Sequence, residues 1–197
     1  MTPTRDDALT LMESWTESDS LRKHMLAVEA AVAAYARHYG EDETLWSVAA
    51  ILHDFDYERY PNPDRDESGH PWVGVRKLQE LGYPEEVTDA ILGHADYTGV
   101  ERRSLLAKTL YACDEITGLI TAAVLVRPDR DIANQTVKSL KKKFKDKAFA
   151  RGVNRDEVRE GAEALGVELW DHVAFVLSAM QDRADVLGLD GRLAQES

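Results

Sequence analysis

Histidine and aspartate residues stand at the ends of apolar segments in this sequence, where they could bind a metal ion. The pair His53-Asp54 directly follows the wholly apolar residues 48–52 and precedes a segment rich in proline and acidic residues. His70 and His94 occupy two further boundaries between expected helices. Imidazole nitrogens mixed with carboxylate oxygens suit iron, manganese, cobalt, nickel or zinc, and suit magnesium less well. These residues therefore predict a site for a divalent transition metal ion.

Asp114 lies in a long apolar segment. Between positions 104 and 126 the only charged residues are Lys108, Asp114 and Glu115. A helix this apolar is buried around most of its circumference, and neighbouring side chains on a helix point about 100° apart, so at least one of the two carboxylates faces the interior. A buried carboxylate needs a cation or several hydrogen-bond donors. A metal ion meets that need, as would a salt bridge or a position at the rim of the buried face.

His24 is a less specific candidate. It lies beside the apolar stripe of its expected helix, three residues after Leu21 and four residues before Val28. A single histidine on such a face is more often a hydrogen-bonded core residue than a ligand. Its assignment therefore depends on the order of the other candidates along the chain.

The spacing of apolar residues predicts helices along almost the whole chain and no strands. Proline, glycine and capping residues mark their ends. The expected helices cover residues 4–15, 18–40, 42–54, 71–82, 84–94, 103–126, 132–149, 156–165 and 167–187. Pro128 divides a metal-binding core of about residues 20–126 from a helical extension of about residues 128–190. We therefore expect an all-α protein, with both parts in one domain spanning residues 1–197.

Composition excludes several classes of protein. The net charge is −12 and the pI is near 4.9, which argues against general nucleic-acid binding. No apolar run approaches the roughly 20 residues that cross a bilayer, and the first residues do not resemble a signal peptide. The single cysteine, Cys113, excludes a disulfide within the chain and a multi-cysteine zinc site. We expect a cytoplasmic protein that does not bind membranes, and we leave its oligomeric state open, a dimer included.

Six candidate ligands together resemble a known family. Their order along the chain is His24, His53, Asp54, His70, His94 and Asp114. This order, with the apolar runs around it, resembles the HD-domain superfamily of metal-dependent phosphohydrolases over about residues 20–126. The resemblance implies a bundle of five or more helices. It also implies a first metal held by the first three candidates and the last one, and a second metal held by His70 and His94, with Asp54 bridging the two.

The resemblance implies a catalytic role for Asp54 beside two metal ions. A metal-activated water would attack a phosphate ester or anhydride in a small anionic substrate, such as a nucleotide. Two other readings stay open. Some proteins of this fold with the same six ligands are di-iron oxygenases of small organic substrates, and a third reading is a metal-stabilised module without catalytic activity.

The sequence departs from the family at one position. Several branches carry a lysine three residues after the aspartate of the His-Asp pair, whereas Tyr57 stands there in this chain. Asp56, between them, is a candidate catalytic residue. It could be a further ligand, the partner of a histidine or a proton acceptor, or it could simply be a solvated loop residue.

A basic segment follows Pro128. Eight basic residues and one acidic residue lie between positions 138 and 155. One interpretation is a solvated helix face that offsets the acidic remainder of the chain. The other is a lid that places Lys141, Lys142 or Lys145 over an anionic substrate.

Overall fold

The computed structural model describes residues 3–195, and every regular element among them is a helix. The only β-type pairing among these residues is an isolated bridge between Asp131 and Asp190. The all-α prediction is therefore confirmed. The α-helices are α1 (Arg5–Trp15), α2 (Asp19–Tyr39), α3 (Glu43–Leu52), α4 (Trp72–Glu80), α5 (Glu85–Gly93), α6 (Leu105–Leu125), α7 (Val137–Lys145), α8 (Arg155–Leu165), α9 (Leu169–Gln181), α10 (Ala184–Leu187) and α11 (Arg192–Gln195), and two 3₁₀ turns are η1 (Asp96–Thr98) and η2 (Ile132–Asn134).

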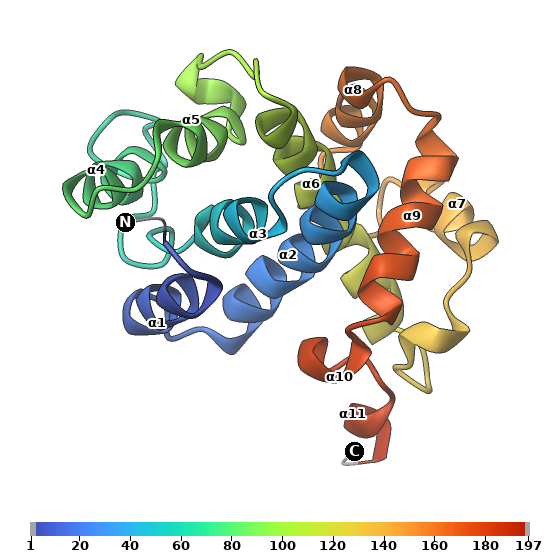
Figure 1. Ribbon diagram of the computed structural model, residues 1–197. Coiled ribbons are helices and arrows are strands. Elements are labelled where there is room, and N and C mark those ends of the chain that lie inside the picture. Colours follow the sequence, from blue (N-terminus) through green and yellow to red (C-terminus); the bar gives the residue numbers. More distant parts are fainter. Residues whose placement is uncertain (1–2, 196–197) are drawn as a thin grey trace.

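Two long helices, α2 and α6, form the centre of the bundle (Figure 1). Helix α2 packs against α3, α6 and α9, and helix α6 also packs against α5 and α8. Helix α1 covers α3, and α4 lies on α5. Helices α2, α3 and α5, which carry candidate ligands, thus contact α6, and helices α7, α8 and α9 contact it as well.

The helix ends follow from local sequence. Thr4 and Asp7 form the reciprocal hydrogen bonds of a capping box at the start of α1. The side chains of Ser18 and Ser104 accept hydrogen bonds from backbone N–H groups in the first turns of α2 and α6. Gly40 ends α2 with a left-handed φ of 74°, a conformation that glycine adopts without a steric penalty. These ends agree with the predicted ones because caps act within a few residues of the chain.

Helix α8 approaches α6 closely because Gly161 has no side chain. A Cβ atom added at Gly161 would lie 2.6 Å from the Cα atom of Ala112. Ala112 and its neighbour Cys113 are fully buried in α6. This contact brings the first turn of α8, with Glu157, toward the residues that surround Asp114.

The extension differs from its predicted helices in two places. The segment 132–149 forms η2, α7 and a series of turns, because Thr136 and Asp146 take extended backbone conformations and cap α7 at its two ends. The segment 167–187 is divided into α9 and α10, since Arg183, which precedes α10, leaves the helical conformation. Both predictions of one continuous helix were wrong.

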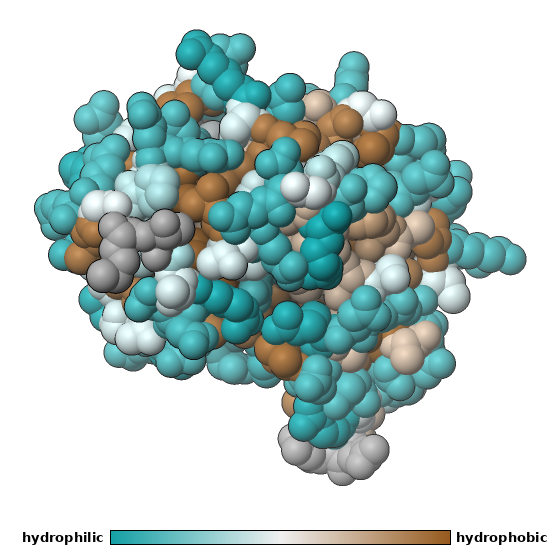
Figure 2. Space-filling model, viewed as in Figure 1, coloured by the Kyte–Doolittle hydropathy of each residue, from teal (hydrophilic) through white to brown (hydrophobic). Residues whose placement is uncertain are grey.

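Hydrophilic residues cover most of the face seen in Figure 2, with hydrophobic residues visible between them. In the part of the chain that the structure describes, none of the helices has the length and apolar character needed to cross a bilayer.

Candidate metal centre

All six predicted ligands come together at one place. Two of them lie within long helices and the other four at helix ends. They are His24 in α2, His53 and Asp54 at the end of α3, His70 just before α4, His94 at the end of α5, and Asp114 in α6. The packing of α2, α3, α5 and α6 therefore brings together residues that are up to 90 positions apart in the sequence.

The first ligand group consists of His24, His53 and Asp114. One ligand atom from each of these residues lies within 4.8 Å of those from the others. The Nε2 atom of His24 is 2.9 Å from Oδ1 of Asp114, and the Nε2 atom of His53 is 3.6 Å from the same oxygen. This triad could hold one metal ion.

The second ligand group consists of Asp54, His70 and His94, and it meets the same 4.8 Å limit. The Nε2 atoms of the two histidines lie 3.3 Å apart. They are 3.3 and 3.4 Å from Oδ1 of Asp54. Two imidazoles and one carboxylate oxygen thus converge on a second point.

Asp54 faces both groups with its two oxygens. While Oδ1 faces His70 and His94, Oδ2 lies 3.7 Å from Nε2 of His24 and 3.5 Å from Nε2 of His53. One carboxylate oxygen is therefore available to each group. This is the arrangement expected of a carboxylate that bridges two metal ions.

Hydrogen bonds on the far side of the rings orient three of the histidines. The Nδ1 atom of His53 lies 2.8 Å from the carbonyl oxygen of Ala50, and Nδ1 of His94 contacts the carbonyl oxygen of Ile91. The Nδ1 atom of His70 lies 2.7 Å from Oδ1 of Asp56. Because each Nδ1 donates its proton to an acceptor, each Nε2 offers a lone pair to a metal when the ring is neutral.

Asp56 lies behind His70 and is fully buried. Its Oδ2 accepts a hydrogen bond of 2.7 Å from the backbone N–H of Gly74, while Oδ1 accepts from His70. A Cβ atom at position 74 would lie 2.7 Å from the Asp56 carboxyl carbon, so the site requires glycine there. Of the roles left open by the sequence, this geometry favours the partner of a histidine.

The charges of the site perturb its pKa values strongly. Burial lowers the pKa of His53, but the nearby Asp54 and Asp114 outweigh burial and raise it to about 9. Burial raises the pKa values of Asp54 and Asp114, yet the adjacent histidines hold both well below the ordinary range. The carboxylates are therefore ionised at neutral pH, and a metal ion would compete with protons for the histidines.

One buried atom tests whether a metal fits. The Nε2 atom of His53 is completely buried and has no hydrogen-bond partner among residues 3–195. An unsatisfied buried nitrogen is costly unless a further group binds it. A metal ion between His53, His24 and Asp114 would satisfy it, so the residues present fit the group that the sequence predicted.

Comparison with family models identifies the chain. The model of the HD domain matches residues 21–119, which is half of the sequence. The chain belongs to the HD domain family. A search of the curated proteins and a search of the solved structures each found no match. HD domains bind divalent metal ions, and the two ligand groups described above lie within the matched residues.

Four of the six candidate ligands line a cavity of about 280 Å³. Asp54, His70, His94 and Asp114 line it together with residues that sequence analysis did not assign to the site. These additional residues include Tyr57, Arg65, Asp96, Tyr97, Glu115 and Glu157. The cavity is small, slightly below the roughly 300 Å³ at which the size range of ligand sites begins.

Two of the additional residues, Glu115 and Glu157, are half-buried carboxylates. Burial and the charge of Asp114 raise the pKa of Glu115 to about 7. Burial also raises the pKa of Glu157, with Asp96 and Asp114 contributing. The side of the cavity near Asp114 is therefore crowded with negative charge.

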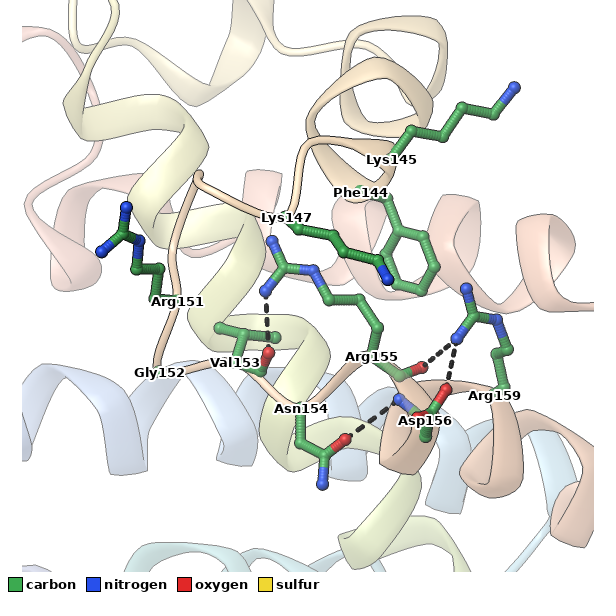
Figure 3. A pocket seen from close by; sticks show the side chains of 10 residues that line it. All are labelled: Phe144, Lys145, Lys147, Arg151, Gly152, Val153, Asn154, Arg155, Asp156 and Arg159. Atoms are coloured by element: carbon green, nitrogen blue, oxygen red, sulfur yellow. Dashed lines mark hydrogen bonds and ion pairs between the residues drawn. The ribbon is translucent and has the colours of Figure 1, made fainter.

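The basic segment forms a separate cavity (Figure 3). Lys145 lines it, whereas Lys141 lies 4.9 Å from the ring centre of Trp170 and Lys142 is exposed. None of the three is among the described residues that line the cavity of the candidate ligands. The side chains of Lys145 and Arg151 extend outward in Figure 3, and Arg155 donates hydrogen bonds to backbone carbonyls around it.

Sequence reasoning missed Arg65, Glu157 and Gly74. Arg65 and Glu157 had no signal of their own, because one lies in a loop with several charges and the other in an amphipathic helix far along the chain. Gly74 offered a usable signal. A glycine inside a predicted helix is unfavourable and usually has a packing reason.

Proposed function

We propose that this HD domain is a metal-dependent phosphohydrolase of a small phosphorylated substrate. The observation that supports it best is the position of Asp54, whose two oxygens face two separate ligand groups beside an open cavity. Two divalent ions held in this way would supply a water nucleophile at neutral pH and stabilise negative charge on phosphorus. Iron, manganese, cobalt, nickel and zinc suit the donor set better than magnesium.

The protein's own residues would have distinct tasks in this reaction. Asp54 and Asp114 supply negative charge to the metal ions, and Asp56 keeps the His70 ring in its binding orientation through the hydrogen bond to Nδ1. Because the two ligand groups share Asp54, both ions would be held at one end of the cavity. A phosphate would therefore lie at that end, with the rest of the substrate extending toward the cavity mouth.

Arg65 is our candidate for the phosphate contact that Tyr57 cannot make. It lines the cavity, and its guanidinium group lies 5.6 Å from the ring centre of Tyr97. The Tyr97 hydroxyl donates a hydrogen bond of 2.9 Å to the carbonyl oxygen of His70, so Arg65 belongs to the His70 side of the cavity. Apart from histidines, no other cationic side chain lines this cavity in the described part of the chain. A planar guanidinium suits phosphate oxygens.

The proposal is tested by metal analysis combined with a substrate screen. The purified protein is analysed for its metal content, stripped, reloaded with each candidate metal and assayed for phosphate release from phosphate esters and anhydrides. We expect metal-dependent release by the wild type, its loss in Asp54→Asn, and its retention in Asp64→Asn, which changes an exposed loop residue.

Three results would contradict the proposal. Less than about half an equivalent of bound metal, with no response to added metal, would show that the protein has no metal centre. Oxygen uptake with a mixed-valent di-iron EPR signal, and no phosphate release, would identify an oxygenase. A metal-bound protein with no turnover on any substrate would identify a metal-stabilised module.

A further inference from the structure

The cavity beside the metal ligands carries opposite charges on its two sides. Arg65 stands on the side of His70, as described above. On the side of Asp114 lie Glu115, the next residue in α6, and Glu157 from the first turn of α8. Asp96 from η1 also lines the cavity. The negative side is thus built from three separate elements.

The fold holds the two glutamates in place without neutralising them. The backbone N–H of Asn154 donates a hydrogen bond of 2.9 Å to Oε2 of Glu115, and its side-chain amide donates to Oε1 of Glu157. Among residues 3–195 no lysine or arginine forms an ion pair with either glutamate. Asp96 differs, because Arg102 pairs with it at 2.8 Å.

These glutamates are part of the ligand cavity and not an isolated acidic patch. They share the cavity with His70, His94 and Asp54, and the unpartnered Nε2 atom of His53 lies 3.6 Å from Asp114, which also lines it. Two divalent ions would be neutralised by Asp54, Asp114 and one phosphate dianion. The ions would then leave no excess positive charge for Glu115 and Glu157, and Arg65, the other cation of the cavity, stands on the side of His70.

We propose that the substrate is a small phosphate ester that carries an ammonium group. Its phosphate lies against the metal ligands and Arg65, and its ammonium group lies against Glu115 and Glu157. A substrate with a second phosphate is disfavoured, because that phosphate would face the two glutamates. This inference rests on the proposed phosphohydrolase function and names its substrate class.

The test compares ligands that differ only in the ammonium group. Calorimetry with the metal-loaded protein at about pH 8 measures binding of 3-aminopropylphosphonate and propylphosphonate, which cannot be hydrolysed. Turnover is measured with the corresponding phosphate esters, 3-aminopropyl phosphate and propyl phosphate. We expect the amine to bind about tenfold more tightly, the effect of one well-placed charge pair that is partly shielded from water.

Matched variants identify the residues responsible. Glu157→Gln should bring the affinity ratio close to one, and Glu163→Gln, an exposed change in the same helix, should leave the ratio as in the wild type. Glu115→Gln gives an independent test should Glu157→Gln fold poorly, since glutamine can still accept the hydrogen bond from Asn154.

The outcomes separate this inference from the function on which it rests. Equal affinity of the wild type for the two phosphonates would overturn the amine preference, whether or not propyl phosphate is hydrolysed. An unchanged affinity ratio in both glutamate variants would overturn the assignment of the ammonium site to Glu115 and Glu157. Amine-selective binding without hydrolysis of either ester would support the selectivity and contradict the phosphohydrolase.

Discussion

Two buried histidines, His53 in the metal-binding core and His172 in the extension, occupy opposite environments. They are 0% and 1% exposed, so burial alone does not separate them. Asp54 and Asp114 lie beside His53 and raise its pKa, and its Nε2 atom has no hydrogen-bond partner in the described residues. It is therefore available to a metal ion.

His172 in α9 has a partner for each ring nitrogen. Its Nδ1 atom accepts a hydrogen bond of 2.7 Å from the Tyr35 hydroxyl, and its Nε2 atom donates one of 2.8 Å to the carbonyl oxygen of Ala112. Burial lowers its pKa. His172 is thus a neutral link between α2, α6 and α9. A ring nitrogen without a hydrogen-bond partner near carboxylates, and not burial, therefore distinguishes a candidate ligand such as His53 from a core histidine such as His172.

The largest effect that this comparison predicts is in Asp54→Ala. Removal of the carboxylate that faces both ligand groups should lower kcat/KM at least about a thousandfold on any substrate found and should lower the bound metal. Elemental analysis and steady-state kinetics measure both effects. Full metal content and full activity in this variant would show that Asp54 does not bridge two metals.

A smaller effect is expected for Asp56→Asn, which alters only the support of His70. Asp56 accepts two N–H bonds, from His70 and Gly74, whereas asparagine places an amide donor against one of them. Metal affinity should fall about 10- to 100-fold, which competition with a chelator measures. Asp64→Asn in the same loop is the control. Equal affinities in the two variants would exclude a positioning role.

His172→Leu should affect stability and not the metal. The change removes the hydrogen-bond partner of the buried Tyr35 hydroxyl and the side-chain hydrogen bond to the Ala112 carbonyl, which should lower the free energy of unfolding by about 2 kcal/mol. Urea unfolding and elemental analysis measure the two quantities. Loss of metal from this variant at ambient temperature would contradict the separation of the two regions.

The smallest predicted effect is on the pH dependence of stability. Since the pKa of His172 is lowered from 6.5 in the folded protein, the unfolded chain binds more protons below that value, and stability falls as pH decreases through it. The wild type should therefore lose stability relative to His172→Leu between about pH 7 and about pH 5. Urea unfolding of both proteins measures the difference. A constant difference across this range would mean that His172 titrates normally.

Much of the fold could be predicted because its signals are local. Capping residues and apolar spacing predicted α1 to α6 with ends close to those observed. The same reasoning failed between positions 132 and 149. The spacing of the lysines there predicts one continuous helix, whereas Thr136 is extended and interrupts it. A capping residue inside a continuous amphipathic pattern does not by itself indicate a helix end, because packing decides which residues are extended.

The candidate site, like the fold, could be predicted from the sequence only in part. Residue type and position at helix ends indicated four of the six candidate ligands, the apolar surroundings indicated Asp114, and the order along the chain indicated His24. The tertiary structure decided which oxygen of Asp54 faces which histidine, and it left His53 without a partner while satisfying His172. It also brought Arg65, Glu115 and Glu157 to one cavity. Helix packing sets these relations across distant segments, and no local pattern in the chain encodes them.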